Sequence, residues 1–292
     1  MKRKIILFLL KTVAALPLCV LYLFADFIFV VVYYLVGYRK KIVRKNIVEA
    51  FPEKSPKEIK SIERQFYRFL CDVIVETIKL LHISDKEIHR RAEILNVEAV
   101  NHSIEAGRSV VILLGHYGNW EWVQEIGKKI TDKAYKASIY HPLSNPLWDS
   151  IFSDIRGRWG MHIVPQKKAP RVLLAKENRP WACGFIADHR PLQVSESNVI
   201  RFLNHNTAFI YGPEEIGNKV GADFFYLEMS RKKRGYYRIR FHELSPSDKS
   251  VPYPYTRLFW KEFEKTIRKH PELWLWSHKR WKFEVPAPMF NN

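Results

Sequence analysis

A histidine and a glutamate, separated by four residues, follow an apolar run in this chain. The run covers residues 109–114, and after Gly115 come His116 and Glu121. A short apolar run rich in valine, isoleucine and leucine predicts a buried β-strand, which would place His116 at the carboxyl end of that strand. Histidine titrates near neutral pH and can take a proton from a hydroxyl group, while a nearby carboxylate can orient its ring. The spacing therefore indicates a general base, with Asn119 capping the helix that carries Glu121.

Several other kinds of chemistry lack their sequence patterns here. A metalloprotease zinc site needs two histidines one helical turn apart with a glutamate between them, whereas the segment 116–121 has one histidine. The chain contains no Gly-x-Ser-x-Gly turn for a serine nucleophile and no glycine-rich loop for a phosphate or dinucleotide. We therefore expect no metal and no cofactor. The remaining chemistry is direct base catalysis, in which His116 takes a proton from a substrate hydroxyl and that oxygen attacks an acyl donor.

The chain is strongly basic. Its 292 residues include 48 lysines and arginines against 30 aspartates and glutamates, a formal net charge of +18. This charge favours an acidic partner: nucleic acid, an anionic membrane surface, a phosphorylated lipid or an acidic carrier protein. We expect no nucleic acid, because the aromatic residues are dispersed and many fall in predicted strands instead of alternating with basic residues on one face. Three scattered cysteines suggest neither a disulfide framework nor a metal cluster and indicate a reducing compartment.

The N-terminal segment is apolar enough to enter a membrane. Residues 5–36 contain only two charged residues, Lys11 and Asp26. As one helix, residues 12–36 would measure ~37 Å, more than the ~30 Å hydrocarbon core of a bilayer. The stretch is too long for a signal peptide, and it ends in two tyrosines followed by basic residues, which is typical of a retained anchor. We predict an anchor over 1–40, spanning in preference to half-embedded with a kink at Pro17, and one catalytic domain over 41–292.

The rest of the chain alternates between helical and strand patterns. Ser55 and Ser84 each begin a capping box, and the first opens a helix that reaches about residue 81. The predicted strands are 94–97, 109–114, 135–140, 162–165, 181–187, 199–202, 224–229 and 236–241. The predicted helices are 99–106, 119–130, 145–158, 168–177, 208–219 and 254–270. Alternation of this kind predicts an α/β fold, a mixed central sheet flanked by helices, behind the N-terminal anchor helix.

The motifs resemble those of the lipid A biosynthesis (late) acyltransferases, a family within the lysophospholipid/glycerolipid acyltransferase superfamily. A His-x4-Glu match alone is weak, but the likeness continues along most of the chain in the family's order. It covers the basic-flanked N-terminal segment, Arg44-Lys45-Asn46, Ala50-Phe51-Pro52-Glu53, Gly115-His116-Tyr117-Gly118-Asn119-Trp120-Glu121, Arg156-Gly157-Arg158-Trp159-Gly160, Gly184-Phe185-Ile186-Ala187-Asp188, Thr207-Ala208-Phe209, Gly212-Pro213 and the closing segment 271–281. The fold expected from this resemblance is the glycerolipid acyltransferase fold.

The resemblance implies an enzyme at the bacterial inner membrane, with its catalytic domain facing the cytoplasm. It would move a fatty acyl group from an acyl-carrier-protein thioester to a hydroxyl of a lipid A precursor, without a covalent acyl-enzyme. His116 would be the base and Glu121 its orienting partner. Its partners would be the acyl carrier protein, the anionic lipid acceptor and the membrane.

Other residues of these motifs are expected to contact substrate. Arg156 and Arg158 have the planar guanidinium groups that bind phosphate or sugar-acid oxygens in pairs. Asp188 ends a predicted strand, and we expect it to line the site. The remaining expected contacts are Gly118, Asn119 and Arg190.

The chain departs from the family pattern after Asp188. The family commonly has glutamine next, whereas His189 and Arg190 follow here. The segment 202–206 also lacks a glycine that is often present. Both departures leave an alternative open, an acyltransferase that acts on a phospholipid or another glycolipid with an acyl-carrier-protein or acyl-coenzyme A donor.

Overall fold

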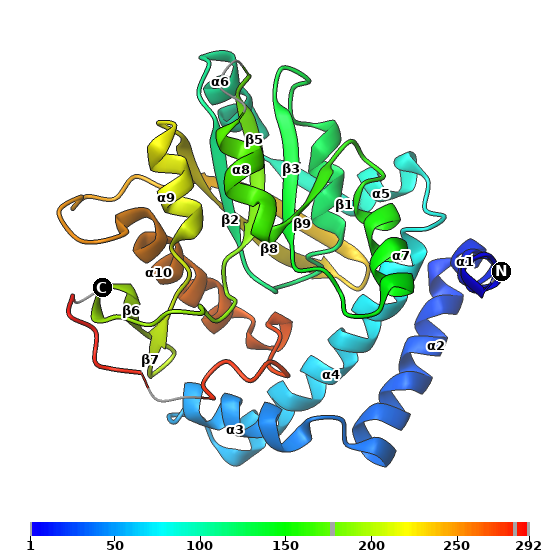
Figure 1. Ribbon diagram of the computed structural model, residues 1–292. Helices are drawn as coiled ribbons and strands as arrows, with labels where there is room; N and C mark the ends of the chain where they lie inside the picture. The colour runs from blue at the N-terminus through cyan, green and yellow to red at the C-terminus, as the bar shows by residue number, and fades with distance from the viewer. Residues whose placement is uncertain (1, 176–178, 283–284, 291–292) are drawn as a thin grey trace.

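A seven-stranded sheet forms the centre of the molecule (Figure 1). The computed structural model describes residues 2–175, 179–282 and 285–290. The strands are β1 (Ala92–Leu95), β2 (Val110–Leu114), β3 (Tyr135–Tyr140), β4 (His162–Pro165), β5 (Trp181–Ile186), β8 (Asp223–Lys233) and β9 (Tyr236–Glu243). They lie in the order β1-β9-β8-β2-β5-β3-β4, and every pairing is parallel except that of β8 with β9. The prediction of a mixed sheet flanked by helices is therefore confirmed.

A separate two-stranded sheet joins β6 (Val199–Phe202) to β7 (His205–Ala208). The strand at 205–208 was not predicted, because its sequence has no apolar run. It forms because Leu203 and Asn204 both take left-handed backbone conformations, with φ of 47° and 65°. Positive φ at both central residues is the geometry that closes a tight hairpin.

Most helices have bounds within a few residues of the predicted ones, but the helix over Lys40–Ala50 was not predicted, and residues 176–177 of the helix predicted over 168–177 lie outside the described residues. The helices are α3 (Lys40–Ala50), α4 (Pro56–Lys79), α5 (Asp85–Arg91), α6 (Val97–Glu105), α7 (Pro146–Arg156), α8 (Ala169–Leu174), α9 (Gly212–Lys219) and α10 (Pro254–Lys269), with short 3-10 turns at Gln166–Lys168, Glu196–Asn198 and Pro271–Leu273. Ser55 caps α4 in a capping box with Glu58, as predicted. The helix predicted over 119–130 is instead a 3-10 helix, Trp122–Lys128.

The N-terminal segment is two helices, with a break at Pro17, where the sequence left room for a kink. The first, α1, covers Lys2–Ala15; the second, α2, covers Leu18–Val30 and continues with π-helical hydrogen bonding through Val31–Val36. The break falls at Pro17, which has no backbone N–H to continue the ladder. Within the described residues, Leu18–Val36 is the one helical stretch long and apolar enough to cross a membrane.

The helix α2 lies alongside α4 (Figure 1), and one side of it joins the main core. Leu21, Ala25 and Phe29 are buried on that side, and the Tyr22 hydroxyl donates a hydrogen bond to Glu76 Oε1 at 2.7 Å. The outer side is exposed and apolar. The division into an anchor over 1–40 and a catalytic domain over 41–292 stays a prediction, although the two share one core.

Candidate active site

The strand register brings His116 and Asp188 together. Leu114 of β2 pairs with Ile186 of β5, and the next rung continues with Ala187 N donating to Leu114 O at 2.7 Å. His116 and Asp188 each lie two residues beyond the Leu114–Ile186 pair. Because β2 and β5 are parallel neighbours, the two residues follow the strand ends at the same height and lie next to each other. The Nδ1 atom of His116 is 2.7 Å from Asp188 Oδ1.

Asp188 is held firmly and is ionised. It is 4% exposed, and its Oδ2 accepts hydrogen bonds from His116 N and Trp274 Nε1, both at 2.9 Å. Burial alone would raise the pKa of this carboxyl, but the charge and hydrogen bond of His116 outweigh it and hold the pKa well below its usual value. An ionised carboxylate only accepts, so Nδ1 of His116 is the donor, and Nε2 is the ring nitrogen that has a lone pair whenever the ring is neutral. A ring held in this tautomer can act as a general base through Nε2.

Asp188, and not the predicted Glu121, is thus the carboxylate that orients His116. Glu121 instead pairs with Arg156, the last residue of α7, through two parallel hydrogen bonds: Nε to Oε2 at 2.8 Å and Nη2 to Oε1 at 2.6 Å. Burial would lower the pKa of Arg156, but the hydrogen bonds and charge of Glu121 outweigh it and raise that pKa above its usual value. The four-residue spacing misled the prediction because Glu121 lies beyond the turn, where it faces α7 and not the imidazole ring.

His116, Glu121 and Arg156 line a cavity of about 630 Å³, within the range of roughly 300–1,000 Å³ usual for small-molecule sites. Asp188, which was predicted to line the site, is not one of the described residues that line this cavity. His116, Trp120, Glu121, Arg156 and His189 form a polar part of its wall. Apolar residues from neighbouring elements form much of the rest, among them Ile112, Leu114, Ile139, Phe185, Ile186, Ile210 and Ile216. A cavity of this kind suits an extended hydrocarbon chain with a reactive polar end. Among the described residues, no group of three or more histidine, cysteine, aspartate or glutamate side chains is placed to hold a metal ion.

Two aromatic rings pack against the His116 ring. Trp120 contacts it edge to face with ring centroids 5.3 Å apart, and His189 does so at 4.6 Å. His189 also lines the cavity. Trp274 is buried, and its indole N–H donates a hydrogen bond to Asp188.

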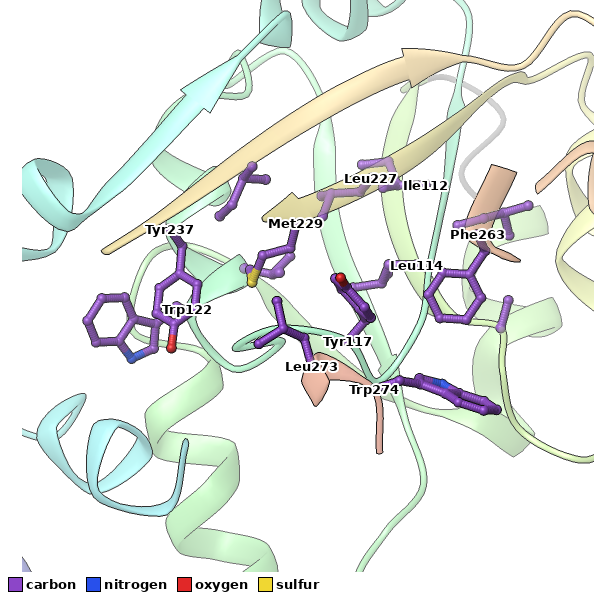
Figure 2. Packing of buried hydrophobic residues seen from close by; sticks show 14 of the residues in the cluster. Ile112, Leu114, Tyr117, Trp122, Leu227, Met229, Tyr237, Phe263, Leu273 and Trp274 are labelled. Atoms are coloured by element: carbon purple, nitrogen blue, oxygen red, sulfur yellow. The ribbon is translucent and has the colours of Figure 1, made fainter. Parts of the chain in front are cut away.

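The loop that carries His116 packs closely against Met229 and Leu273. Gly118 has φ of +62°, its N–H donates to Leu273 O at 3.0 Å, and a Cβ built on it would lie 2.6 Å from Met229 Sδ. Figure 2 shows Met229, Leu273 and Tyr117 gathered in this packing. Gly118 therefore serves the backbone of the loop, because a left-handed conformation and a close neighbour both favour glycine.

Asn119 and Arg158 also have structural partners. Asn119 is fully buried; its Nδ2 donates to Glu76 Oε2 at 2.6 Å and its Oδ1 accepts from Trp122 N. Arg158 donates to the backbone carbonyls of Leu80 and Ile83, just beyond the end of α4. As far as the structure describes the chain, neither lines the cavity, nor do Gly118 and the exposed Arg190. The structure therefore places none of these four residues at the cavity, where they were predicted to contact the substrate.

Glu76 is a supporting element of the site that sequence reasoning missed. It is fully buried in α4 and accepts hydrogen bonds from the side chains of Tyr22, Asn119 and Tyr237. The Trp122 indole N–H also donates to its backbone carbonyl at 3.2 Å. Glu76 thereby links α2, the loop that carries His116 and β9 through hydrogen bonds. A single glutamate in a helical pattern gives no sequence signal of such a role.

Known proteins similar to this chain are acyltransferases of lipid A biosynthesis. A family described as bacterial lipid A biosynthesis acyltransferase matches residues 3–283. The chain is similar to the lipid A biosynthesis palmitoleoyltransferase of Escherichia coli (strain K12), with 23% identity over 251 residues, covering 84% of this chain and 79% of the relative. It is also similar to the lauroyltransferase of the same organism, with 25% identity over 254 residues and the same coverage. The chain therefore belongs to the bacterial lipid A biosynthesis acyltransferase family and is an acyltransferase.

Proposed function

We propose that this enzyme transfers a fatty acyl group from an acyl-carrier-protein thioester to a hydroxyl of a lipid A precursor, with His116 as general base. The observation that carries the proposal is the His116–Asp188 hydrogen bond at the wall of an apolar cavity. The bond orients the ring and leaves Nε2 free to accept a proton. The apolar side chains that line the cavity offer the acyl chain a surface against which it can bury its methylene groups.

The reaction proceeds by direct transfer. As Nε2 of His116 takes the hydroxyl proton, the acceptor oxygen attacks the thioester carbonyl carbon and a carbon–oxygen bond forms. The tetrahedral intermediate then collapses, the carbon–sulfur bond breaks, and the departing sulfur takes the proton from Nε2. The products are an ester and the free thiol of the carrier. Asp188 stabilises the imidazolium that exists between the two proton transfers.

The Glu121–Arg156 pair contributes a fixed polar wall. Two nitrogens of the guanidinium are bonded to Glu121, and a guanidinium has further N–H groups to offer. In our proposal these remaining donors bind an anionic or carbonyl oxygen of the substrate. Glu121 then acts by holding Arg156 in place and not by touching His116.

In this proposal the enzyme works at the inner membrane, facing the cytoplasm. Supporting this are the exposed apolar side chains of α1 and α2, including Phe8, Leu9, Phe24 and Phe27, which on a soluble protein would form an unusually large apolar patch. The net charge of +18 favours approach to both anionic lipid and an acidic carrier protein.

A transfer assay with purified protein tests the function. Acyl-carrier-protein thioester and a lipid A precursor are supplied in detergent, and the acylated product is measured by mass spectrometry. We expect His116→Ala to lower the rate by about 10²–10⁴-fold, the usual contribution of a general base. The matched control is His102→Ala, an exposed histidine of α6. Equal rates for the two variants, or acylation of a phospholipid in place of the lipid A precursor, would overturn the proposal.

A further inference from the structure

A second cavity lies between α2, α4 and the hairpin of β8 and β9. Its volume is about 560 Å³, and among the described residues it shares no lining side chain with the cavity at His116. Four arginines line it: Arg64 and Arg68 from α4, and Arg231 and Arg234 from the hairpin. We call it the arginine cleft.

The two hairpin arginines are paired with carboxylates. Arg234 bonds to both Asp26 and Asp72, and Arg231 Nη2 bonds to the buried Asp72 at 2.9 Å. These bonds hold both guanidinium groups in place at the wall of the cleft.

The two α4 arginines have no carboxylate partner. Arg64 and Arg68 lie one helical turn apart and are exposed, and neither forms an ion pair with any residue that the structure describes. The Arg68 guanidinium lies over the Phe29 ring, 5.2 Å from its centroid. Glu272, the remaining acid of the cleft, is 3.7 Å from His270. Because Arg64 and Arg68 carry like charges at this helical spacing, they repel each other, and an anion bound between the two guanidinium groups would be stabilised.

The cleft opens beside the exposed apolar side of α2. Val30 and Tyr34 line the cleft and are themselves 47% and 55% exposed. The same helix also exposes Leu23, Phe27 and Leu35, at 68%, 67% and 75%. A continuous strip of exposed apolar side chains next to arginines without carboxylate partners is the pattern of a helix that lies in the membrane interface.

We propose that the arginine cleft binds the phosphate of an anionic membrane lipid whose acyl chains lie along the exposed side of α2. This inference rests on the membrane association in the proposed function. Guanidinium groups bind phosphate oxygens in pairs, and the exposed Arg64 and Arg68 supply such donors at the wall of the cleft. The lipid is a bilayer component and not the acyl acceptor, because the cleft is separate from the cavity at His116.

Vesicle flotation of the full chain tests the proposal. Protein purified in mild detergent is mixed with vesicles of phosphatidylcholine alone or with phosphatidylglycerol added, at one fixed ionic strength. The double variant Arg64→Gln/Arg68→Gln is compared with Arg90→Gln/Arg171→Gln, which removes the same charge from two exposed arginines outside the cleft. We expect the first to weaken binding to the anionic vesicles by at least about tenfold and the second to change it much less, since a basic residue near an anionic surface contributes about 1 kcal/mol.

Equal weakening by the two double variants would mean that only net charge matters, and no weakening would mean that the cleft does not meet the lipid; either result overturns the proposal. Inorganic phosphate is tested against chloride by thermal unfolding. Stabilisation by phosphate that needs Arg64 and Arg68, without any preference for anionic vesicles, would show a free-anion site and also overturn it. His116→Ala separates the two proposals, because it should bind anionic vesicles like the wild type whatever its transfer rate.

Discussion

The imidazole of His116 and the carboxylate of Asp188 are 2.7 Å apart although 72 residues separate them in the chain. The contact is a consequence of parallel pairing between β2 and β5, whose register places both residues two positions beyond the last strand pair. Asp188 is fixed by the Trp274 indole and the His116 backbone N–H as well as by the ring. The ring of His116, the proposed base, is therefore oriented by residues that follow the carboxyl ends of two central strands.

Replacing this carboxylate by its amide should disable the base. In Asp188→Asn, the amide can donate to Nδ1, which would move the ring proton to Nε2 and remove the lone pair that takes the substrate proton. We expect kcat to fall by about 10²–10⁴-fold with KM little changed. Steady-state kinetics measures this, with Asp248→Asn, an exposed loop aspartate, as the control. A loss confined to KM would contradict an orienting role for Asp188.

The Glu121–Arg156 pair should behave as one unit in a double-mutant cycle. Glu121→Gln leaves the largely buried guanidinium of Arg156 without its charge partner, and breaking such a pair costs about 3–5 kcal/mol. The double variant Glu121→Gln/Arg156→Gln removes both charges and should recover part of the loss in free energy of unfolding. Denaturant unfolding of the four proteins gives the coupling. Strictly additive losses would show that the pair is not coupled.

Gly184 offers a test of the acyl-chain site. It lines the cavity in β5, has ordinary backbone conformation, and a Cβ built on it would come no closer than 3.6 Å to Ser138 Oγ. Glycine is thus not required by the backbone, and its small size leaves cavity volume open. We expect Gly184→Leu to fold and to shift the preferred acyl donor toward shorter chains. Competition between acyl-carrier-protein thioesters of different length measures the shift, and an unchanged preference would place the chain elsewhere.

Glu76 should make stability depend on pH. Burial raises the pKa of its carboxyl despite the hydrogen bonds from Tyr22, Tyr237 and Asn119. A carboxyl whose pKa is raised in the fold stabilises the protein fully below its unfolded pKa of about 4.3, and that contribution is lost as the pH rises through the raised value. Relative to wild type, Glu76→Gln should therefore gain free energy of unfolding as the pH rises above about 4.3. Parallel pH profiles for the two proteins would rule this out.

The sequence predicted the sheet, the strand end at His116 and the family, because these depend on local patterns. It did not predict which carboxylate meets His116, since that depends on β2 and β5 being neighbours, and strand order is not a local property. The same limit explains Glu121: its distance in sequence from His116 is short, but α7 supplies Arg156 from another part of the chain. Arg158 and Asn119 matched family motifs, yet their partners are backbone carbonyls and the buried Glu76.

The most direct test of the central claim is mass spectrometry of lipid A from cells that lack this protein, complemented either with wild type or with His116→Ala. Our account predicts that lipid A lacks one acyl chain in the deletion, that wild type restores it, and that His116→Ala, produced at the same level, does not. Unchanged lipid A with an altered phospholipid or other glycolipid, or full restoration by His116→Ala, would contradict it.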